Sequence, residues 1–332
     1  MHLAEKEINI LGAGIGGLSC ATILQKNGYT VNVYEKKSGV GMRFNNDWQG
    51  IENWSEDIDV LKQIESYGID TSFEYEPINS LCFHLGKKKK LLDVKNGAYL
   101  VRRGKEKGSL DTNLLKQAEN LGVKVYFNSR IGANIHIDAT GPKKGNILAR
   151  GILFSTKSVD GYHMAIGEEI AEGFYSYLLI RKGHGTIATV FGSKNSNRSN
   201  EFLENTIDQF SDYIDKKELL EGKKFGGYGN FEIKKNPRDK NGALLIGEAG
   251  GFQDCFWGFG MRYAIQTSYL AARSIMNNES YEELIKANIT PKMKHSNRNR
   301  VLFESLGKLS YPILYYSLAK SRRPLKILKT LY

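Results

Sequence analysis

The sequence predicts an α/β fold: a parallel sheet covered by helices, an inserted, mainly antiparallel sheet, and a helical C-terminal tail. Residues 7–37, EINILGAGIGGLSCATILQKNGYTVNVYEKK, pass from a short apolar run through a glycine-rich turn into helical spacing and then into a second apolar run. Residues 150–235 consist mostly of short strand-like segments separated by turns, which is typical of an antiparallel sheet. The last 50 residues have helical spacing that prolines interrupt.

The segment 7–37 predicts one βαβ unit. Its first apolar run gives a buried strand, which the glycine-rich run 12–17 breaks abruptly. A helix follows and ends at Gly28, and the second strand ends on Glu35. A glycine turn in an unrelated α/β fold is the alternative. The strand, the helix and the acid nevertheless all fall where a dinucleotide-binding unit requires them.

Each glycine of this unit has a physical role. Gly12 permits the tight turn, Gly14 lets the backbone approach a pyrophosphate, and Gly17 lets the helix lie close to the strand. The helix N-terminus presents free N–H groups to the phosphates, and Glu35 can accept hydrogen bonds from ribose hydroxyls. The sequence therefore predicts a Rossmann-like dinucleotide site. Its expected contact residues are Gly12, Ala13, Gly14, Ile15, Gly16, Gly17, Glu35 and Lys36.

The elements after this unit alternate between two predicted domains. Ser55 is expected to cap a helix that runs to about Ser66, and residues 73–92 predict strands with a solvated hairpin tip at Lys87 to Lys90. The predicted dinucleotide-binding domain is discontinuous, and a substrate domain and a basic tail complete the chain. Their residues are 1–50, 95–150 and 236–280 for the first, 51–94 and 151–235 for the second, and 281–332 for the tail.

Three strand-to-glycine junctions resemble those of FAD-dependent oxidoreductases of the glutathione-reductase and p-hydroxybenzoate-hydroxylase type. The first is GAGIGGLSCATILQKNGYTVNVYEK, the second is IHIDATG at residues 135–141, and the third is ALLIGEAGGF at residues 243–252. The third junction carries Glu248 where that superfamily has an aspartate that binds a ribityl hydroxyl. The resemblance implies that an extended FAD is held at all three junctions.

The resemblance also implies further FAD contacts. In GFGMRYAIQTSYLAA, Gly258 and Gly260 free the backbone to approach the flavin, and the following helix N-terminus stabilises an anionic reduced flavin. A simple glycine N-cap is the alternative. Arg43 and Arg103 resemble arginines near the pyrophosphate, although either could be a solvated surface residue. The implied contacts are Arg43, Arg103, Thr140, Gly141, Gly247, Glu248, Gly258, Gly260 and Met261.

The segment GEAGGFQDCFWGFGMRYAIQTSYLAA is most similar to that of the geranylgeranyl reductases, which saturate prenyl double bonds with reduced FAD. The resemblance implies a hydrophobic prenyl or lipid-like substrate and places Phe256 and Trp257 beside the flavin. Trp48, Trp54, Tyr175, Tyr177 and Phe252 are further candidates for an apolar pocket. The W-x-W-x-I-P segment of flavin halogenases is missing. No second G-x-G-x-x-G exists, so electrons are expected from transiently docked NAD(P)H or from a separate reductase.

Two other functions remain open. One is a single-component flavin monooxygenase (hydroxylase) in which reduced flavin reacts with O₂. The other is a membrane-peripheral flavoprotein whose FAD is structural or serves electron transfer alone.

Cysteine, histidine and hydropathy patterns limit the other possibilities. Cys20, Cys82 and Cys255 are odd in number and distant, which excludes disulfide scaffolding and a CxxC pair and favours a reducing, cytoplasmic setting. The six histidines show no metal-ligand spacing, so no metal site is expected. The start MHLAEKEINIL lacks the pattern of a signal peptide, and no apolar run of about 18 residues predicts a spanning helix.

Positive charge is concentrated in the C-terminal tail. Residues 286–332 contain seven Lys, four Arg and one acid, Glu304, which gives +10 of the net charge of +11. The mixture of Leu, Ile and Tyr with cations suits a helix at an anionic membrane surface. A helical layer packed on the protein's own body is the alternative. Nucleic acid is disfavoured because no recognition module is apparent.

Overall fold

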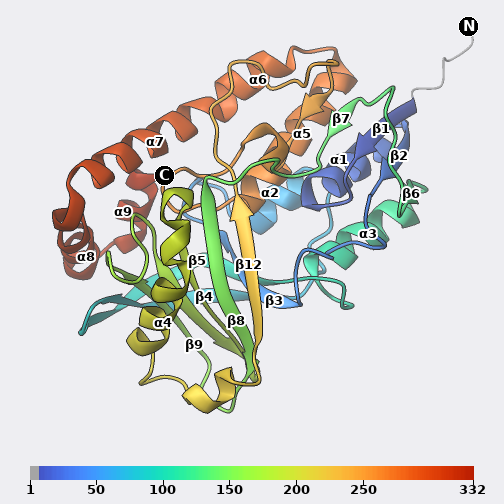
Figure 1. Cartoon of the computed structure of the whole chain (residues 1–332). Helices are drawn as coiled ribbons and strands as arrows, with labels where there is room; N and C mark the ends of the chain where they lie inside the picture. Colours follow the sequence, from blue (N-terminus) through green and yellow to red (C-terminus); the bar gives the residue numbers. More distant parts are fainter. Residues whose placement is uncertain (1–6) are drawn as a thin grey trace, which may run out of the picture.

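The computed structural model describes residues 7–332, which form two sheets with helices around them (Figure 1). Residues 1–6 of the predicted dinucleotide-binding domain lie outside the described residues. The smaller sheet and its helices carry the glycine turn, and the larger sheet lies beside them with the last two C-terminal helices packed on it (Figure 1). The predicted α/β fold with an inserted, mainly antiparallel sheet is confirmed.

The smaller sheet is parallel, in the order β13-β7-β1-β2-β6. Its strands are β1 (Glu7–Leu11), β2 (Thr30–Tyr34), β6 (Lys124–Tyr126), β7 (Ile137–Asp138) and β13 (Leu244–Leu245). The helices α1 (Ile15–Lys26), α3 (Leu110–Asn120) and α5 (Met261–Asn277) belong to this domain. Helix α1 packs against both α3 and α5, and ten of its twelve residues are buried. Parallel strands that carry such helices read as short apolar runs because both faces are covered.

The larger sheet has the order β12-β8-β11-β10-β9-β4-β5-β3. All neighbours in it are antiparallel except β4 and β9, which are parallel. Its strands are β3 (Asp47–Glu52), β4 (Tyr75–Leu85), β5 (Lys88–Arg103), β8 (Ile147–Ser155), β9 (Gly161–Ile166), β10 (Ser176–Arg181), β11 (His184–Gly192) and β12 (Lys223–Gly229). Helix α4 (Ser199–Gln209) packs on β8 and β11.

Two local expectations differ from the structure. Helix α2 (Val60–Ser66) is capped by Asp59, whose carboxylate accepts hydrogen bonds from the N–H groups of Leu61 and Lys62. Ser55 therefore does not start this helix. Strand β5 belongs to the larger sheet along its whole length, to Arg103. Strand β4 pairs with most of β5, and β3 pairs with the C-terminal part of β5. The predicted boundary at residue 95 consequently falls inside a strand.

The tail is helical, as predicted. It contains α6 (Tyr281–Asn288), α7 (Thr290–Ser305), α8 (Ser310–Lys320) and α9 (Pro324–Leu331), with a short 3-10 helix at Gly307–Leu309. Three further 3-10 helices lie earlier in the chain, at Ser193–Arg198, Lys216–Leu219 and Gly247–Gly250. Pro291, Pro312 and Pro324 lie in the first turns of α7, α8 and α9, where the missing N–H costs no helical hydrogen bond. Helix α8 contacts β4 and β5, and α9 contacts β5 (Figure 1).

None of the helices formed by residues 7–332 is both long and apolar enough to cross a membrane.

Candidate cofactor and substrate site

Three predicted strand-to-glycine junctions meet at one edge of the parallel sheet. Strands β1, β7 and β13 are adjacent and parallel, so their carboxyl ends, which lead to Gly12, Gly141 and Gly247, point the same way. A Cβ added to Gly12 would lie 2.6 Å from the carbonyl oxygen of Ala139, which follows β7. Ligands of open α/β sheets bind outside the carboxyl ends of the strands. The structure therefore brings the three junctions together.

The glycine turn leaves room for a ligand at one position and none at another. A Cβ on Gly17 would lie 1.9 Å from the carbonyl oxygen of Gly12, so α1 lies directly against the turn. At Gly14, by contrast, an added Cβ meets no atom within 4 Å. Gly14 is also the N-cap of α1, and no side chain caps that helix end. Its first turn therefore faces open space with its partial positive charge, as a pyrophosphate site requires.

Glu35 lies beside the turn. Its Oε2 accepts a hydrogen bond from the N–H of Ala13 at 2.9 Å, and its Oε1 accepts one from the N–H of Lys37 at 2.9 Å. These bonds fix the carboxylate next to the glycine run and leave lone pairs on both oxygens for further donors. The neighbouring Lys36 is exposed. Glu35 is therefore placed to accept from ribose hydroxyls of a nucleotide at the turn.

Arg43 and Glu248 form an ion pair at the border between the two sheets. Arg43 Nη1 lies 3.1 Å from Glu248 Oε2, and its Nη2 donates to the carbonyl of Tyr228 on β12. Both side chains are partly exposed, so the pair contributes little stability by itself. It instead sets the position of both groups. Arg43 and Glu248 thus line the same cavity as a paired cation and carboxylate.

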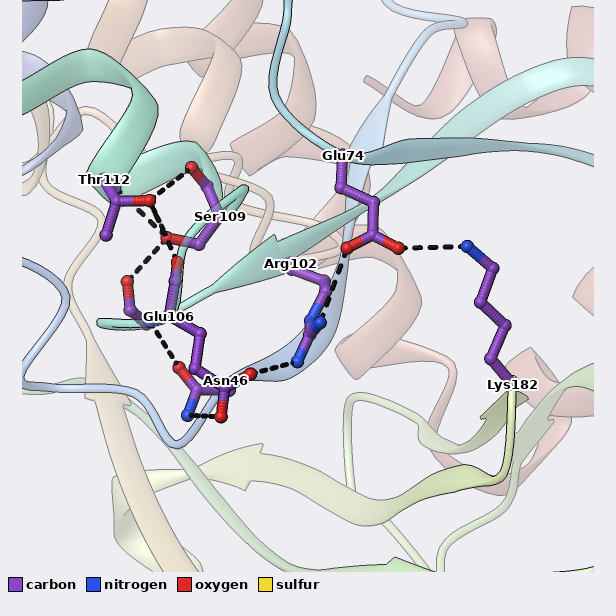
Figure 2. A network of polar contacts seen from close by, with 8 residues as sticks. Asn46, Glu74, Arg102, Glu106, Ser109, Thr112 and Lys182 are labelled. Carbon is purple, nitrogen blue, oxygen red and sulfur yellow. Dashed lines mark hydrogen bonds and ion pairs between the residues drawn. The ribbon is translucent and has the colours of Figure 1, made fainter. Parts of the chain in front are cut away.

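The loop that carries Arg43 is held by a polar network (Figure 2). Asn46 Nδ2 donates to Glu106 at 2.8 Å, and Glu106 also pairs with Arg102 at 2.5 Å. Arg102 reaches Glu74, which pairs with Lys182 at 3.0 Å in the β10–β11 turn. Gly41 supports the loop further, because a Cβ there would lie 2.3 Å from the carbonyl oxygen of Gly104. Neither glycine was predicted, since a close approach of two distant loops leaves no local pattern.

Two predicted cofactor contacts have protein partners in the structure. Arg103 is buried, forms a two-pronged pair with Asp111 at 2.9 and 3.0 Å, and lies over the ring of Phe44. Thr140 donates from its N–H and its hydroxyl to Asp138 at 2.9 and 2.6 Å. These bonds orient the loops on either side of the nucleotide site.

A cavity of about 330 Å³ runs from these groups along the inner face of the larger sheet. Arg43, Glu248, Gly258, Gly260 and Met261 line one end, next to the N-terminus of α5. Apolar residues of β4, β5, β8 and β10 line its middle. Three leucines of the tail, which the sequence did not single out, line it as well: Leu318, Leu325 and Leu328. The cavity is therefore polar at the cofactor edge and largely apolar beyond it.

Three residues that line this cavity carry buried polar atoms without partners. Among the described residues, Gln253 Oε1, Trp54 Nε1 and Trp257 Nε1 are buried and make no hydrogen bond, and all three residues line the cavity. Leaving such groups unpaired costs about 1–3 kcal/mol each. The open space at Gly14 and the polar lining by Arg43 and Glu248 fit a flavin dinucleotide that extends from the turn into the cavity.

The structure separates the two residues predicted to lie beside the flavin. Trp257 lines the cavity, as do Trp48, Trp54, Tyr175 and Tyr177. Phe256 lies behind Trp257, with ring centroids 4.9 Å apart, and packs on Phe303 of α7. Phe256 and Phe252 are not among the cavity-lining residues.

Side chains of helix α7 fix the 254–258 loop by hydrogen bonds. Arg300 donates to the carbonyls of Cys255 and Phe256 at 2.9 and 2.6 Å, and Ser296 Oγ accepts from the N–H of Phe256 at 3.0 Å. Buried Asp254 accepts from Ser296 and from the N–H of Gly258. Burial raises the pKa of Asp254, while the hydrogen bonds from Ser296 and from the N–H groups of Trp257 and Phe256 oppose that shift. Arg300 and Asp254 were missed because the contacts that join α7 to this loop, Arg300 with Cys255 and Phe256 and Asp254 with Ser296, link residues more than 40 positions apart.

The comparisons with known proteins agree with this geometry. A family model described as an NAD(P)-binding Rossmann-like domain matches residues 10–53. No curated protein matches the sequence of the chain.

Solved structures share the fold over nearly the whole chain. A geranylgeranyl bacteriochlorophyll reductase-like protein from Thermoplasma acidophilum is 17% identical, with a TM-score of 0.74 over 97% of this chain and 93% of that one. A flavoprotein/dehydrogenase from Cytophaga hutchinsonii is 14% identical, with a TM-score of 0.69 over 98% and 91%. A flavin-dependent brominase is 13% identical, with a TM-score of 0.64 over 98% and 92%. The chain therefore has the fold of the FAD-dependent oxidoreductases, as the sequence predicted.

Proposed function

We propose that this protein is an FAD-dependent oxidoreductase that reduces a carbon–carbon double bond of a hydrophobic, prenyl or lipid-like substrate. The observation that carries the proposal is the cavity, which is polar beside Glu248 and the glycine loop and apolar from there to the tail leucines. Sites for small molecules combine apolar walls with a few polar groups in this way. The structural likeness to a geranylgeranyl bacteriochlorophyll reductase-like protein supports the same substrate class.

The residues of this chain divide the work of binding. Gly12, Gly14 and Gly17 with Glu35 would hold the adenosine and pyrophosphate, and Glu248 with the 258–260 loop would hold the part that enters the cavity. When bound and reduced, FAD supplies a hydride. The N-terminus of α5 at Gly260 carries no side-chain cap and favours negative charge at that end of the cavity.

Saturating a double bond requires one hydride, which carries two electrons, and one proton. Tyr175 and Tyr177 line the cavity and carry hydroxyl protons at physiological pH. Burial raises the pKa of both hydroxyls, which makes them weak acids, so a tyrosine that donates its proton has to be reprotonated at once. The apolar walls exclude water from the double bond. NAD(P)H or a separate reductase would return the two electrons, as the absence of a second dinucleotide motif in the sequence suggests.

An anaerobic single turnover tests this function. The protein reduced in D₂O and mixed with a geranylgeranyl lipid should yield a product that has gained deuterium at the former double bond, detected by mass spectrometry. A Tyr177→Phe variant should retain FAD and slow this step if the hydroxyl donates the proton. Substrate-dependent O₂ consumption with oxygen in the product would contradict the reductase and favour the hydroxylase alternative. If the lipid is unchanged and the reduced flavin is not reoxidised, the proposed reductase activity is contradicted. FAD would then have an electron-transfer or structural role.

We also propose that the tail docks on an anionic membrane. Its inner face packs on the body, as Leu318 and Leu328 are 1% and 7% exposed, whereas Leu309 and Ile313 on its outer face are 66% and 54% exposed. The lysine-rich hairpin tip at residues 87–90 lies beside this outer face, because Lys88 Nζ contacts Tyr316 Oη at 2.6 Å. Apolar side chains ringed by lysines match the interface of an anionic bilayer.

Vesicle flotation tests the membrane proposal independently of catalysis. The protein should float with phosphatidylglycerol-containing vesicles but not with pure phosphatidylcholine, and binding should fall with added salt. Leu309→Asp should abolish flotation. Leu220→Asp, at a leucine that is 84% exposed outside the tail, is the matched control and should float normally. Equal flotation of both variants would contradict a docking role for the tail.

A further inference from the structure

The larger sheet brings together three side chains that no pattern in the sequence groups. Cys82 and His84 lie two residues apart on β4, so both point to the same face of the sheet. His163 lies directly opposite Cys82 on the parallel neighbour β9. The possible ligand atoms of the three residues all lie within 4.8 Å of one another. Strand pairing rather than sequence spacing makes the cluster, which explains why no metal site was expected.

We propose that Cys82, His84 and His163 bind one divalent transition-metal ion, with Zn²⁺ as the ion of choice. Two imidazole nitrogens and a thiolate are ligands that zinc prefers. His84 Nε2 lies 3.2 Å from His163 Nδ1, close to the roughly 3.3 Å between two nitrogens on one tetrahedral zinc ion. The Cys82 sulfur has to approach by about 1 Å at most, which a small side-chain rotation provides.

The surroundings suit such a site. His84 and His163 are 2% and 8% exposed. Tyr213 packs on His163 with ring centroids 4.0 Å apart. Cys82 is only partly buried, which gives the ion a path from solvent and leaves a fourth position for water.

One charge opposes the ion. Lys89 Nζ donates to Tyr213 Oη at 3.1 Å and lies close enough to disfavour positive charge on the histidines. Lys89 is exposed at the hairpin tip and can turn into solvent when the metal binds. The neighbouring Phe83 and Met164, whose side chains point to the opposite face of the sheet from Cys82 and His84, line the cavity, and so does His163. A metal would therefore fix β4 against β9 at the wall of the cavity, outside the flavin chemistry proposed above.

Metal titration of the full-length protein tests the proposal. After treatment with a chelator, the flavin-loaded protein should bind one Co²⁺ per chain. The bound cobalt should show d–d absorption bands in the red part of the visible spectrum, as tetrahedral Co²⁺ does, and Zn²⁺ should displace the cobalt. Cys82→Ser and His84→Asn should each weaken the affinity at least tenfold. His184→Asn changes an exposed histidine of the same sheet and should bind cobalt like the parent protein.

A second measurement needs no variant. Cys20 and Cys255 are buried, so iodoacetamide should react with Cys82 first in the folded metal-free protein. Saturating Zn²⁺ should slow this alkylation at least tenfold. Absence of stoichiometric cobalt binding together with unprotected Cys82 would show that the histidines form only a hydrogen-bonded pair. Unchanged cobalt binding by Cys82→Ser would equally overturn the proposal. Both outcomes are independent of whether the flavin reduces a double bond.

Discussion

At the scale of single residues, two glycines of the same turn, three positions apart, differ in the space around them. A Cβ on Gly17 would lie 1.9 Å from a backbone oxygen, whereas one on Gly14 would meet nothing within 4 Å. Gly17 therefore serves the fold, and Gly14 leaves space for a ligand. The sequence predicted both roles, because the G-x-G-x-x-G pattern ties each glycine to a position in the turn.

Alanine at each position should separate these roles. Gly17→Ala should destabilise the apoprotein by several kcal/mol, because α1 must move away from the turn. Gly14→Ala should cost less than about 1 kcal/mol, the usual difference at an N-cap, and yet weaken FAD binding strongly. Urea denaturation of the apoproteins and flavin titration measure the two effects. Equal destabilisation by both substitutions would contradict the assignment.

Glu35 tests the nucleotide half of the site. Glu35→Ala removes the acceptor for ribose hydroxyls, and a charge-assisted hydrogen bond contributes about 1.5–3 kcal/mol. The variant should therefore bind FAD roughly 10- to 100-fold more weakly in a fluorescence titration. Glu204→Ala on the exposed face of α4 is the control and should bind like the parent protein. Unchanged affinity of Glu35→Ala would place the ribose elsewhere.

At the scale of elements, the tail has two faces with different environments. Its inner leucines pack on the larger sheet and line the cavity, while its outer leucines remain exposed. The sequence left packing on the body and membrane docking as alternatives for the whole tail. The structure shows the packing and leaves one face for the proposed docking. Helical spacing alone could not show this, because α8 and α9 have apolar residues on more than one side.

Matched leucine truncations measure this difference. Leu328→Ala should lower the free energy of unfolding by about 2–4 kcal/mol, because it leaves a hole beside β5. Leu309→Ala should change it by less than about 0.5 kcal/mol, because that side chain is exposed. Chemical denaturation of both variants gives the comparison. Similar small effects would mean that the tail is not part of the cooperative core.

The start of α2 and the cavity walls show where sequence reasoning ends at this scale. Ser55 and Asp59 are both good capping residues four positions apart, and only the tertiary contacts of Asn53 and Tyr99 with Asp59 decide between them. Strands β7 and β13 have two residues each, yet they were located because each leads into a glycine. The cavity walls come from strands and tail helices distant in sequence, so no local pattern indicates them.

At the scale of the whole molecule, the C-terminal residue is tied to the first strand of the larger sheet. Tyr332 Oη lies 2.8 Å from Glu52 Oε1, and both residues are buried. Burial raises the pKa of Glu52 from 4.5 to about 7, because the charged carboxylate loses its hydration. The folded protein therefore keeps a proton on Glu52 that the unfolded chain releases above about pH 4.5.

This difference predicts a pH dependence. The free energy of unfolding should fall as the pH rises from about 4.5 to 7, by roughly 3 kcal/mol from this group. Glu52→Gln removes that contribution, so the variant should be more stable than the parent protein at pH 8 and similar to it near pH 4.5. His84 and His163, whose pKa burial lowers to about 4, act in the opposite direction below pH 6.5, but they are the same in both proteins. Parallel stability curves from urea denaturation would contradict the buried, protonated state of Glu52.

The central claim is that FAD lies between the glycine turn and the apolar cavity. The most direct measurement is the flavin content of the purified full-length protein, compared with that of Gly14→Ala after incubation of both with excess FAD and gel filtration. The account predicts one FAD per chain in the parent protein and little in the variant, with both proteins folded by circular dichroism. A parent protein that retains no flavin, or a variant that retains as much, would contradict it.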